Sequence, residues 1–286
     1  MTTTYAAEPA TTTRYVFGEG LRWDAAAGEL LWVDLMAGRL QRAPLDRLDE
    51  PAVVEVGMPL GAFAPASAGG LVLAAGQGLA HLAPDGAVRH LAALEPVTHR
   101  MNDAACDAAG RFWAGSTAYD EREGGGALYR LELDGTVSTV RDDVSISNGP
   151  AWSPDGRTMY LDDSGRSVLL AYDVDPDTGD VRGERALVEF AEGAGDGLAV
   201  DDDGHLWVAV FGGSAVHRYD PAGRLVATVP LPASQVTSCC LAEGRLYATT
   251  AAKGMRDPEP DAGRLFVAEV GVGAPAVLPY RGVLPG

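Results

Sequence analysis

The chain has 286 residues with 40 acidic and 22 basic side chains, so its formal net charge is −18. This excess of acid argues against nucleic acid and against an anionic membrane surface as partners, because both attract clustered positive charge. Hydrophobic residues make up 47% of the chain, and its 36 glycines and 18 prolines are more turn formers than a helical protein tolerates.

The beginning of the chain and its cysteines indicate where the protein folds. Residues 1–13 lack the basic and apolar segments of a secretion signal, and no stretch reaches the ~18 apolar residues of a spanning helix. We expect a disordered leader over 1–13 and one domain over 14–286. Three cysteines, of which Cys239 and Cys240 are neighbours, argue against a disulfide framework beside Cys106. We therefore expect a cytoplasmic protein.

One unit recurs along the chain: a short strand, a turn of the Asp-x-x-Gly type, and a second strand rich in Trp, Tyr, Leu and Val. Successive turn glycines are 42, 40, 46, 48 and 40 residues apart, and each interval has room for four strands. Four-stranded antiparallel units at this period are the blades of β-propellers. The sequence predicts an all-β fold, a six-bladed β-propeller around a central channel. The turn glycines are Gly28, Gly70, Gly110, Gly156, Gly204 and Gly244.

In chain order, the six copies read LRWDAAAGELLWVD, AFAPASAGGLVLAA, AACDAAGRFWAGS, AWSPDGRTMYLDD, LAVDDDGHLWVAV and CCLAEGRLYATT. Asp before Gly in several of these turns suits tight hairpins, because Gly takes positive φ without strain. A closed ring leaves no sheet edge exposed. We expect Thr13–Val16 to close it by adding a strand near Leu246 and Phe266. The alternative is an unpaired leader up to Phe17.

Polar residues occupy one register of the repeat. The position eight residues before the turn glycine is Asn102, Asn148 and Asp196 in the third, fourth and fifth copies, and Glu19 lies nine residues before the first turn glycine. The second and sixth copies have Ala and Val there. Because the innermost strand of each blade lines the channel, we expect these four polar groups to converge on one rim.

Two carboxylates and two amides at a channel rim repel one another and lose water unless a cation neutralises them. Glu19, Asn148 and Asp196 offer three oxygen donors, a set that suits one divalent ion: Ca²⁺, Mg²⁺ or Mn²⁺, with Zn²⁺ or Fe²⁺ also possible. Three protein ligands leave open positions, as in a catalytic site. The alternative is that Asn148-Gly149 and Asp196-Gly197 are ordinary turns entering strands.

Five segments resemble, in order and spacing, the motifs of the SMP-30/gluconolactonase/regucalcin family. The resemblance implies a propeller with one divalent metal in the channel and hydrolysis of sugar lactones. Its metal ligands would be Glu19, Asn148 and Asp196, and its substrate contacts Arg100 and Asn102. The segments are GEGLRWDAAAGELLWVD, HRMNDAACDAAGRFWAGS, SISNGPAWSPDGRTMYLDDS, GDGLAVDDDGHLWVAVFGG and TSCCLAEGRLYATT.

The loop YDEREGGGAL after the third repeat is charged and then Gly-rich, which suits a cover at the channel mouth. Members of the family use an acidic residue of this loop against the substrate, and Glu121 is the nearest match. The loop differs here in length and has an additional glycine, which leaves the size of the substrate open. The alternative for Glu121 is a solvated charge.

The expected reaction is ring opening of an aldonolactone to an aldonic acid, with a metal-polarised carbonyl and an activated water. Asp196 is the candidate general base, or it only binds the metal. Arg100 and Asn102 are two apart, so on an extended strand both face the substrate, unless Arg100 makes a surface ion pair. Asp103 points the other way on a regular strand, so we expect a structural role. His99, beside Arg100, is the only histidine of further interest.

Two other functions remain open. The same metal site suits a different reaction, such as hydrolysis of another ester or a phosphotriester, or a cyclisation or dehydration. A non-enzymatic, calcium-binding propeller is the other. The expected partner is a small-molecule lactone, without nucleic acid or membrane, and the protein is expected to be a monomer or small homo-oligomer.

Overall fold

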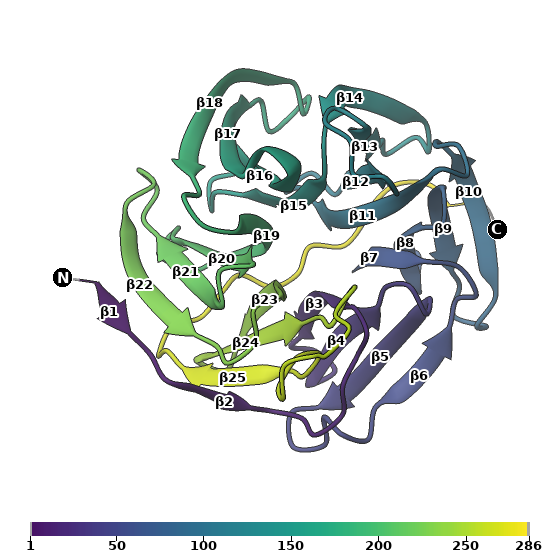
Figure 1. Ribbon diagram of the computed structural model, residues 1–286. Coiled ribbons are helices and arrows are strands. Elements are labelled where there is room, and N and C mark those ends of the chain that lie inside the picture. The colour runs from purple at the N-terminus through teal and green to yellow at the C-terminus, as the bar shows by residue number, and fades with distance from the viewer. Residues whose placement is uncertain (1, 285–286) are drawn as a thin grey trace.

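Six antiparallel sheets stand in a ring (Figure 1). The computed structural model describes residues 2–284, and each sheet contains four antiparallel strands, one sheet being extended by a fifth. This is the six-bladed β-propeller that the repeat spacing predicts. Within residues 2–284, the only helical segment is the 3-10 turn η1 (Ser164–Arg166), and no helix there is long and apolar enough to cross a membrane.

The blades follow the chain order, and each begins with its innermost strand. Blade 1 contains β3 (Gly18–Asp24), β4 (Glu29–Asp34), β5 (Arg39–Pro44) and β6 (Ala52–Glu55). Blade 2 contains β7 (Leu60–Pro65), β8 (Leu71–Ala75), β9 (Gly78–Leu82) and β10 (Val88–Ala93). Blade 3 contains β11 (His99–Cys106), β12 (Phe112–Ala118), β13 (Gly126–Leu131) and β14 (Val137–Val144).

The second half of the ring repeats this pattern. Blade 4 contains β15 (Ser147–Trp152), β16 (Thr158–Asp163), β17 (Val168–Val174) and β18 (Val181–Glu189). Blade 5 contains β19 (Ala194–Val200), β20 (Leu206–Phe211), β21 (Ala215–Tyr219), β22 (Leu225–Pro230) and β1 (Thr3–Thr4). Blade 6 contains β23 (Val236–Ala242), β24 (Arg245–Thr250), β25 (Phe266–Glu269) and β2 (Ala7–Pro9).

The turn chemistry explains the first hairpin. Asp24 closes the β3–β4 turn by accepting hydrogen bonds at Oδ1 from the backbone N–H groups of Ala26 and Ala27, both at 3.0 Å. Gly28 then takes φ +68°, a left-handed conformation that disfavours residues with a side chain. The same Asx-type closure recurs at later repeats, so the glycine spacing in the sequence reports the blade spacing.

The ring closes at a place that the sequence did not predict. Strand β2 pairs antiparallel with β25, with Ala7 opposite Ala268, and β1 pairs parallel with β22. The closing strand therefore comes from the leader expected to be disordered, and Thr13–Val16 is not the closing strand. Instead, Tyr15 packs against Trp32 with ring centroids 5.9 Å apart. Without β2, the backbone groups of β25 would form an open edge, which explains why this short segment forms a strand.

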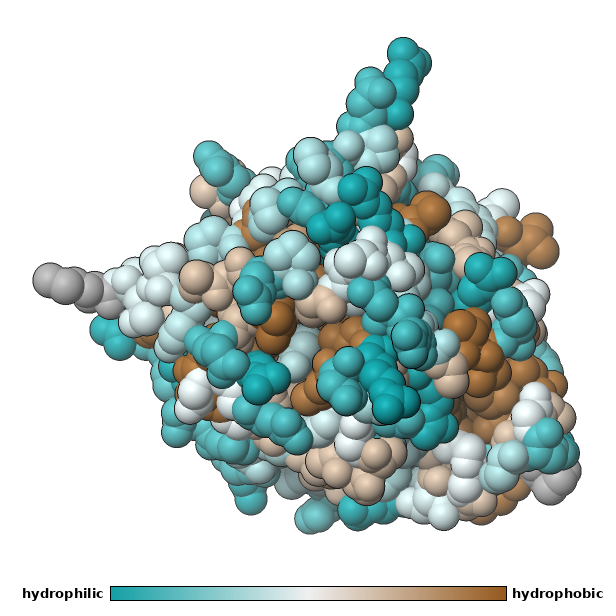
Figure 2. All heavy atoms as spheres, turned by 90° about the horizontal axis from the view of Figure 1, so that it is seen from below, coloured by the Kyte–Doolittle hydropathy of each residue, from teal (hydrophilic) through white to brown (hydrophobic). Residues whose placement is uncertain are grey.

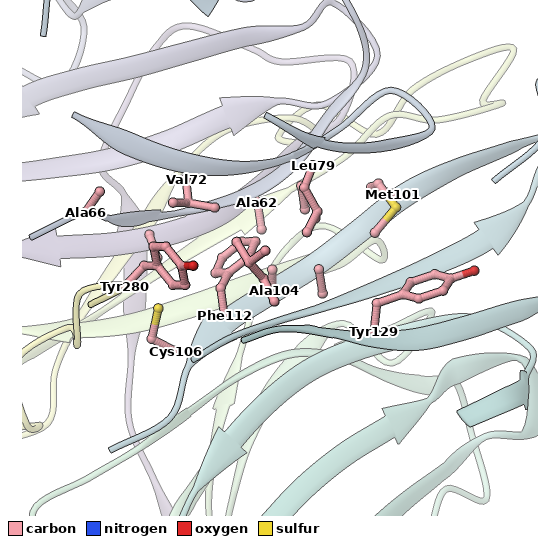
Figure 3. Close-up of a cluster of buried hydrophobic side chains, with 14 of the residues drawn as sticks. Ala62, Ala66, Val72, Leu79, Met101, Ala104, Cys106, Phe112, Tyr129 and Tyr280 are labelled. Carbon is pink, nitrogen blue, oxygen red and sulfur yellow. The ribbon is translucent and has the colours of Figure 1, made fainter. Parts of the chain in front are cut away.

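Apolar side chains fill the wedges between neighbouring blades. Figure 3 shows one such cluster, in which Val72 and Leu79 of blade 2 pack with Met101 and Phe112 of blade 3, beside Tyr280. On the face seen in Figure 2, hydrophilic residues predominate and hydrophobic residues gather in several patches, the broadest at the right of the view. The three cysteines are buried and unbridged.

The C-terminal segment crosses the ring at the ends of the innermost strands (Figure 1). Asp202, just after β19, donates its backbone N–H to the carbonyl of Gly273 at 3.0 Å. Arg281 donates its backbone N–H to the carbonyl of Gly110, in the turn after β11, also at 3.0 Å. We call the opposite side, where the innermost strands begin, the mouth of the channel.

Candidate functional site

Four innermost strands each contribute one polar side chain at the mouth. These are Glu19 on β3, Asn102 on β11, Asn148 on β15 and Asp196 on β19, and each is only 4–5% exposed. With Arg100, also on β11, we call them the axial cluster. The shared register in the sequence thus predicts a convergence that the structure contains.

A bulge in each strand turns these side chains inward. Each of these innermost strands pairs with the second strand of its blade, and in each the register shifts at or just after the polar position. The four strands are β3, β11, β15 and β19. In three of the strands a glycine follows the polar residue, and Gly149 takes φ +45°. Bulges re-aim side chains next to functional sites, and glycine provides the backbone freedom that this bulge needs.

Hydrogen bonds fix the orientation of both amides. The Arg100 guanidinium donates to Oδ1 of Asn102, and Nδ2 of Asn102 donates to Oδ1 of Asn148 at 2.5 Å. Asn148 Nδ2 donates in turn to Ser164 Oγ at 2.8 Å, and Ser164 donates to the carbonyl of Gly195 at 2.5 Å. The Asn148 amide is therefore oriented directly by Asn102 of blade 3 and, through Ser164 of its own blade, by the Gly195 carbonyl of blade 5.

Asp103 has the structural role expected from the sequence. Its carboxylate accepts hydrogen bonds from the backbone N–H of Gly149 at 3.0 Å and of Ala104 at 2.8 Å. Arg22 of blade 1 also donates to it, with Nη2 3.1 Å from Oδ1. The carboxylate thus joins blades 1, 3 and 4 beside the axis.

Arg100 is not a surface ion pair, because it is only 6% exposed. Its guanidinium carbon lies 5.8 Å from the ring centroid of Phe17. Burial lowers the pKa of Arg100, while the charges of Glu19 and Asp196 oppose that change. A donor with five N–H groups therefore faces the two carboxylates across the channel mouth.

The ionised forms of the two axial carboxyls, Glu19 and Asp196, are destabilised. Burial raises the pKa of Glu19 well above its usual range, and the charges of Asp196 and Asp103 raise it further. Burial also raises the pKa of Asp196 strongly, with Asp103 adding to the effect and Arg100 opposing it. Within residues 2–284, Asp196 Oδ1 accepts no hydrogen bond. A buried, unpartnered carboxylate oxygen beside a second carboxylate and an amide oxygen fits a hard divalent cation.

Sequence reasoning missed one buried acid in this region. Asp162 on β16 is 0% exposed, and neither of its carboxylate oxygens has a hydrogen-bond partner in the described part of the chain. Burial raises its pKa strongly, with Asp196 the next largest cause. A Cβ on Gly195 would lie 2.0 Å from Asp162 Oδ1. In the sequence, the only signal was the pair of aspartates at the end of the segment YLDD, of which Asp162 is the first.

Glu121 lies at the rim of the mouth, on the connection between β12 and β13. Its carboxylate is 2.5 Å from Nζ of Lys253, and the side chains are 47% and 42% exposed. Nearby, Arg122 donates to Nε2 of His99 at 3.0 Å. Glu121 is therefore neither a free solvated charge nor part of the buried axial cluster, and no sequence pattern indicates its partner.

A second group of possible ligands lies elsewhere, at Asp201, Asp203 and His205. Asp201 Oδ1 accepts the backbone N–H groups of Asp203 and His205, at 3.0 and 2.9 Å. Its Oδ2 accepts Trp207 Nε1 at 3.0 Å and Arg218 Nε at 2.8 Å. With both oxygens occupied by the protein, this group is better explained as a structural turn.

Comparisons with known proteins cover nearly the whole chain. The sequence profile of the SMP-30/Gluconolactonase/LRE-like region matches residues 17–252. The proposed sugar lactone lactonase YvrE of Bacillus subtilis is 35% identical over 292 aligned residues, which cover 94% of this chain and 97% of that protein. Regucalcin of Danio rerio is 36% identical over 281 residues, covering 92% and 93%.

A solved structure agrees with the sequence matches. The crystal structure of regucalcin from Agrobacterium tumefaciens, described as a calcium-binding protein, has a TM-score of 0.91 and 27% identity, and the match covers 98% of this chain and 100% of that one. The profile match alone spans all five residues of the axial cluster.

Proposed function

The chain belongs to the SMP-30/gluconolactonase/LRE-like family, and on this premise we propose that it is a divalent-metal-dependent hydrolase that opens the ring of a sugar lactone. The observation that carries the proposal is Asp196 Oδ1, a buried carboxylate oxygen without a partner in residues 2–284, at the point where four blades converge. The product would be the corresponding aldonic acid.

Glu19, Asn148 and Asp196 would hold the cation. Their oxygens come from three blades, and Asn148 is already oriented by Asn102 and Ser164. When bound, a divalent cation polarises a lactone carbonyl and makes water a better nucleophile at neutral pH. Burial, and then neighbouring acids, raise the pKa of both axial carboxyls, and a bound cation would favour their ionised forms.

Arg100 and Asn102 would position the lactone. Both side chains face the mouth from β11, so Arg100 can donate to the ring carbonyl or to hydroxyl groups, while Asn102 contacts the remaining polar atoms. Asp196 is also the candidate general base: its carboxylate lies at the proposed cation and would accept the proton that the attacking water loses. Burial beneath the rim excludes bulk water and strengthens these interactions.

The direct test is hydrolysis of D-glucono-1,5-lactone, L-arabinono-1,4-lactone and D-xylono-1,4-lactone by the purified protein. We expect turnover that a chelator abolishes and that Ca²⁺, Mg²⁺, Mn²⁺ or Zn²⁺ restores. The Asp203→Ala variant, in the turn after β19, controls for nonspecific effects of losing an acid. Full activity of the metal-stripped protein would contradict the proposal.

Calcium binding without turnover is the second candidate, and the description of the Agrobacterium regucalcin as calcium-binding favours it. Both candidates predict that Glu19→Ala weakens Ca²⁺ binding in calorimetry. They differ in the lactone assay, because only a hydrolase releases acid in proportion to protein concentration. A protein that binds Ca²⁺ but leaves all three lactones intact would establish the second candidate.

A further inference from the structure

Lys253 is the only lysine in the chain, since the other 21 basic residues are arginines. It follows β24 in blade 6, and its Nζ lies 2.5 Å from the carboxylate of Glu121. Glu121 belongs to blade 3, which stands opposite blade 6 in the ring. The ion pair therefore joins opposite sides of the channel mouth.

Lys253 also lies near Arg100. Its Nζ is 5.2 Å from the ring centroid of Phe17, and the Arg100 guanidinium carbon approaches the same ring at 5.8 Å. Burial raises the pKa of Asp196, and the positive charge of Lys253 is among the influences that oppose this rise. Lys253 thus faces the same channel as the residues proposed to hold the metal and the lactone ring.

The loop that carries Glu121 is held in place by other contacts. Glu123 pairs with Arg166 of η1 at 3.3 Å, and Gly124 donates its backbone N–H to Ser145 Oγ at 3.1 Å. Glu121 itself has φ +53°, a left-handed conformation that is strained for a residue with a side chain. These contacts keep the carboxylate pointed across the mouth despite that strain.

A carboxylate beside an ammonium group offers an acceptor and donors to neighbouring hydroxyl groups. Both side chains are about half exposed, and exposed ion pairs contribute little to stability, so substrate hydroxyls can replace their mutual contact at little cost. A ring bound at the axial cluster would direct its outer substituents toward this pair. An unsubstituted ring would leave the pair untouched.

We propose that Lys253 is a specificity-determining residue which, with Glu121, binds the hydroxyl groups of a polyhydroxylated lactone at the channel mouth. This inference rests on the proposed lactonase function and adds the part of the site that distinguishes sugar lactones from simple ones. Arg100 and Asn102 act on the reacting ring, whereas Lys253 acts on its substituents.

The kinetic experiment compares two six-membered lactones that differ in their hydroxyl groups, D-glucono-1,5-lactone and δ-valerolactone. We expect Lys253→Met to lower kcat/KM for the gluconolactone about tenfold, mainly through KM, and to leave δ-valerolactone within about twofold. Lys253→Arg should retain most of the activity. Equal losses on both substrates, or none on either, would overturn the proposal.

A matched control is available on the same strand. Arg245, at the other end of β24, pairs with Glu269 at 2.8 Å, and its side chain is 41% exposed, close to the 42% of Lys253. Arg245→Met also removes one exposed ion pair from blade 6, but far from the mouth. We expect it to change neither substrate's kinetics.

A binding measurement separates this inference from the lactonase proposal. D-glucitol carries hydroxyl groups but no lactone, so it is not hydrolysed. We expect it to slow hydrogen exchange of the 119–126 amides in the wild-type protein and in Arg245→Met, but not in Lys253→Met. This result would support the role of Lys253 even if no lactone were turned over, whereas absent protection in the wild type, or equal protection in Lys253→Met, would refute it.

Discussion

Asp107 and Asp201 follow the far ends of β11 and β19, while Asn102 and Asp196 lie at the mouth ends of the same two strands. The far carboxylates are saturated with donors. Asp107 accepts from Arg111 and from Trp113 Nε1 at 2.9 Å, and Asp201 accepts from Trp207 and Arg218 in the corresponding arrangement. At the mouth, by contrast, Asp196 Oδ1 lacks a donor within residues 2–284.

The two ends have similar burial, so burial alone does not explain the difference. Asp201 is 0% exposed and Asp196 is 5% exposed. The difference lies in donors: each far carboxylate has an indole N–H and an arginine, while among residues 2–284 Glu19 has only the backbone N–H of Gly20, at 3.2 Å. An acid whose acceptors are all used stabilises the fold, and an acid with unused acceptors is available for a cation, a proton or a substrate.

The largest effect should come from removing an axial carboxylate. We expect Glu19→Ala and Asp196→Ala each to lower lactone hydrolysis at least about a hundredfold, because each removes a cation ligand and Asp196 also the candidate base. The free energy of unfolding of the metal-free protein should not fall. Assays at saturating metal and urea unfolding with chelator present measure the two quantities. A loss of stability comparable with the loss of activity would show that Glu19 and Asp196, like Asp107 and Asp201, mainly stabilise the fold.

Removing a far carboxylate should have the opposite result. Asp201→Ala leaves Trp207 Nε1 without its acceptor and leaves the largely buried Arg218 with only the exposed Asp203, 3.5 Å away, so we expect the free energy of unfolding to fall by about 3 kcal/mol. Urea denaturation measures this fall, with Asp203→Ala as the control because that side chain is 69% exposed. Lactone hydrolysis by the folded fraction should be unchanged. A loss of metal binding in Asp201→Ala would show that Asp201, Asp203 and His205 form a metal site after all.

A steric test examines Asp162, a buried acid that, unlike Asp107 and Asp201, has no hydrogen-bond partner in the described part of the chain. Gly195→Ala would place a methyl group 2.0 Å from Asp162 Oδ1, so we expect a destabilisation of about 2 kcal/mol from overpacking. Asp162→Ala in the same chain should recover most of that loss. The recovery is measured as a coupling energy in a double-mutant cycle. Additive effects would show that the two residues do not touch.

The smallest effect we expect is a pH dependence of stability from the same residue. Burial raises the folded-state pKa of Asp162, so its carboxyl stays protonated in the folded protein after it has ionised in the unfolded chain. The folded state therefore loses stability as the pH rises above about 4 toward the folded pKa. With chelator present, Asp162→Asn should be increasingly more stable than wild type across this range. A constant difference from pH 4 to 8 would contradict the raised pKa.

The sequence predicted what the repeat encodes. Turn glycines such as Gly28 predicted the number of blades, because each blade is formed by consecutive residues. The shared register of Asn148 and Asp196 predicted that their side chains converge, because the innermost strand of every blade lines the same channel. Contacts across the ring carry no such signal. Lys253 and Glu121 are 132 positions apart, and nothing in either segment specifies the other.

Ring closure was missed for a related reason. Ala7–Pro9 has only three residues and ends in proline, so its own composition does not indicate a strand. It is ordered by the free backbone groups of β25, whose position depends on five preceding blades. Asp162 was missed because its environment comes from Gly195 on the next blade, whose missing side chain makes room for the carboxylate.

The pairing of β2 with β25 also sets the order in which the protein can be completed during synthesis. Residues 7–9 leave the ribosome early, but their partner is not finished until Glu269 has been made. Each earlier blade can form from consecutive residues as it emerges, whereas the last one joins segments about 260 positions apart, with the loop-closure entropy that this separation implies. Until then the growing chain carries one unfilled sheet edge, the kind of surface that chaperones protect in nascent proteins.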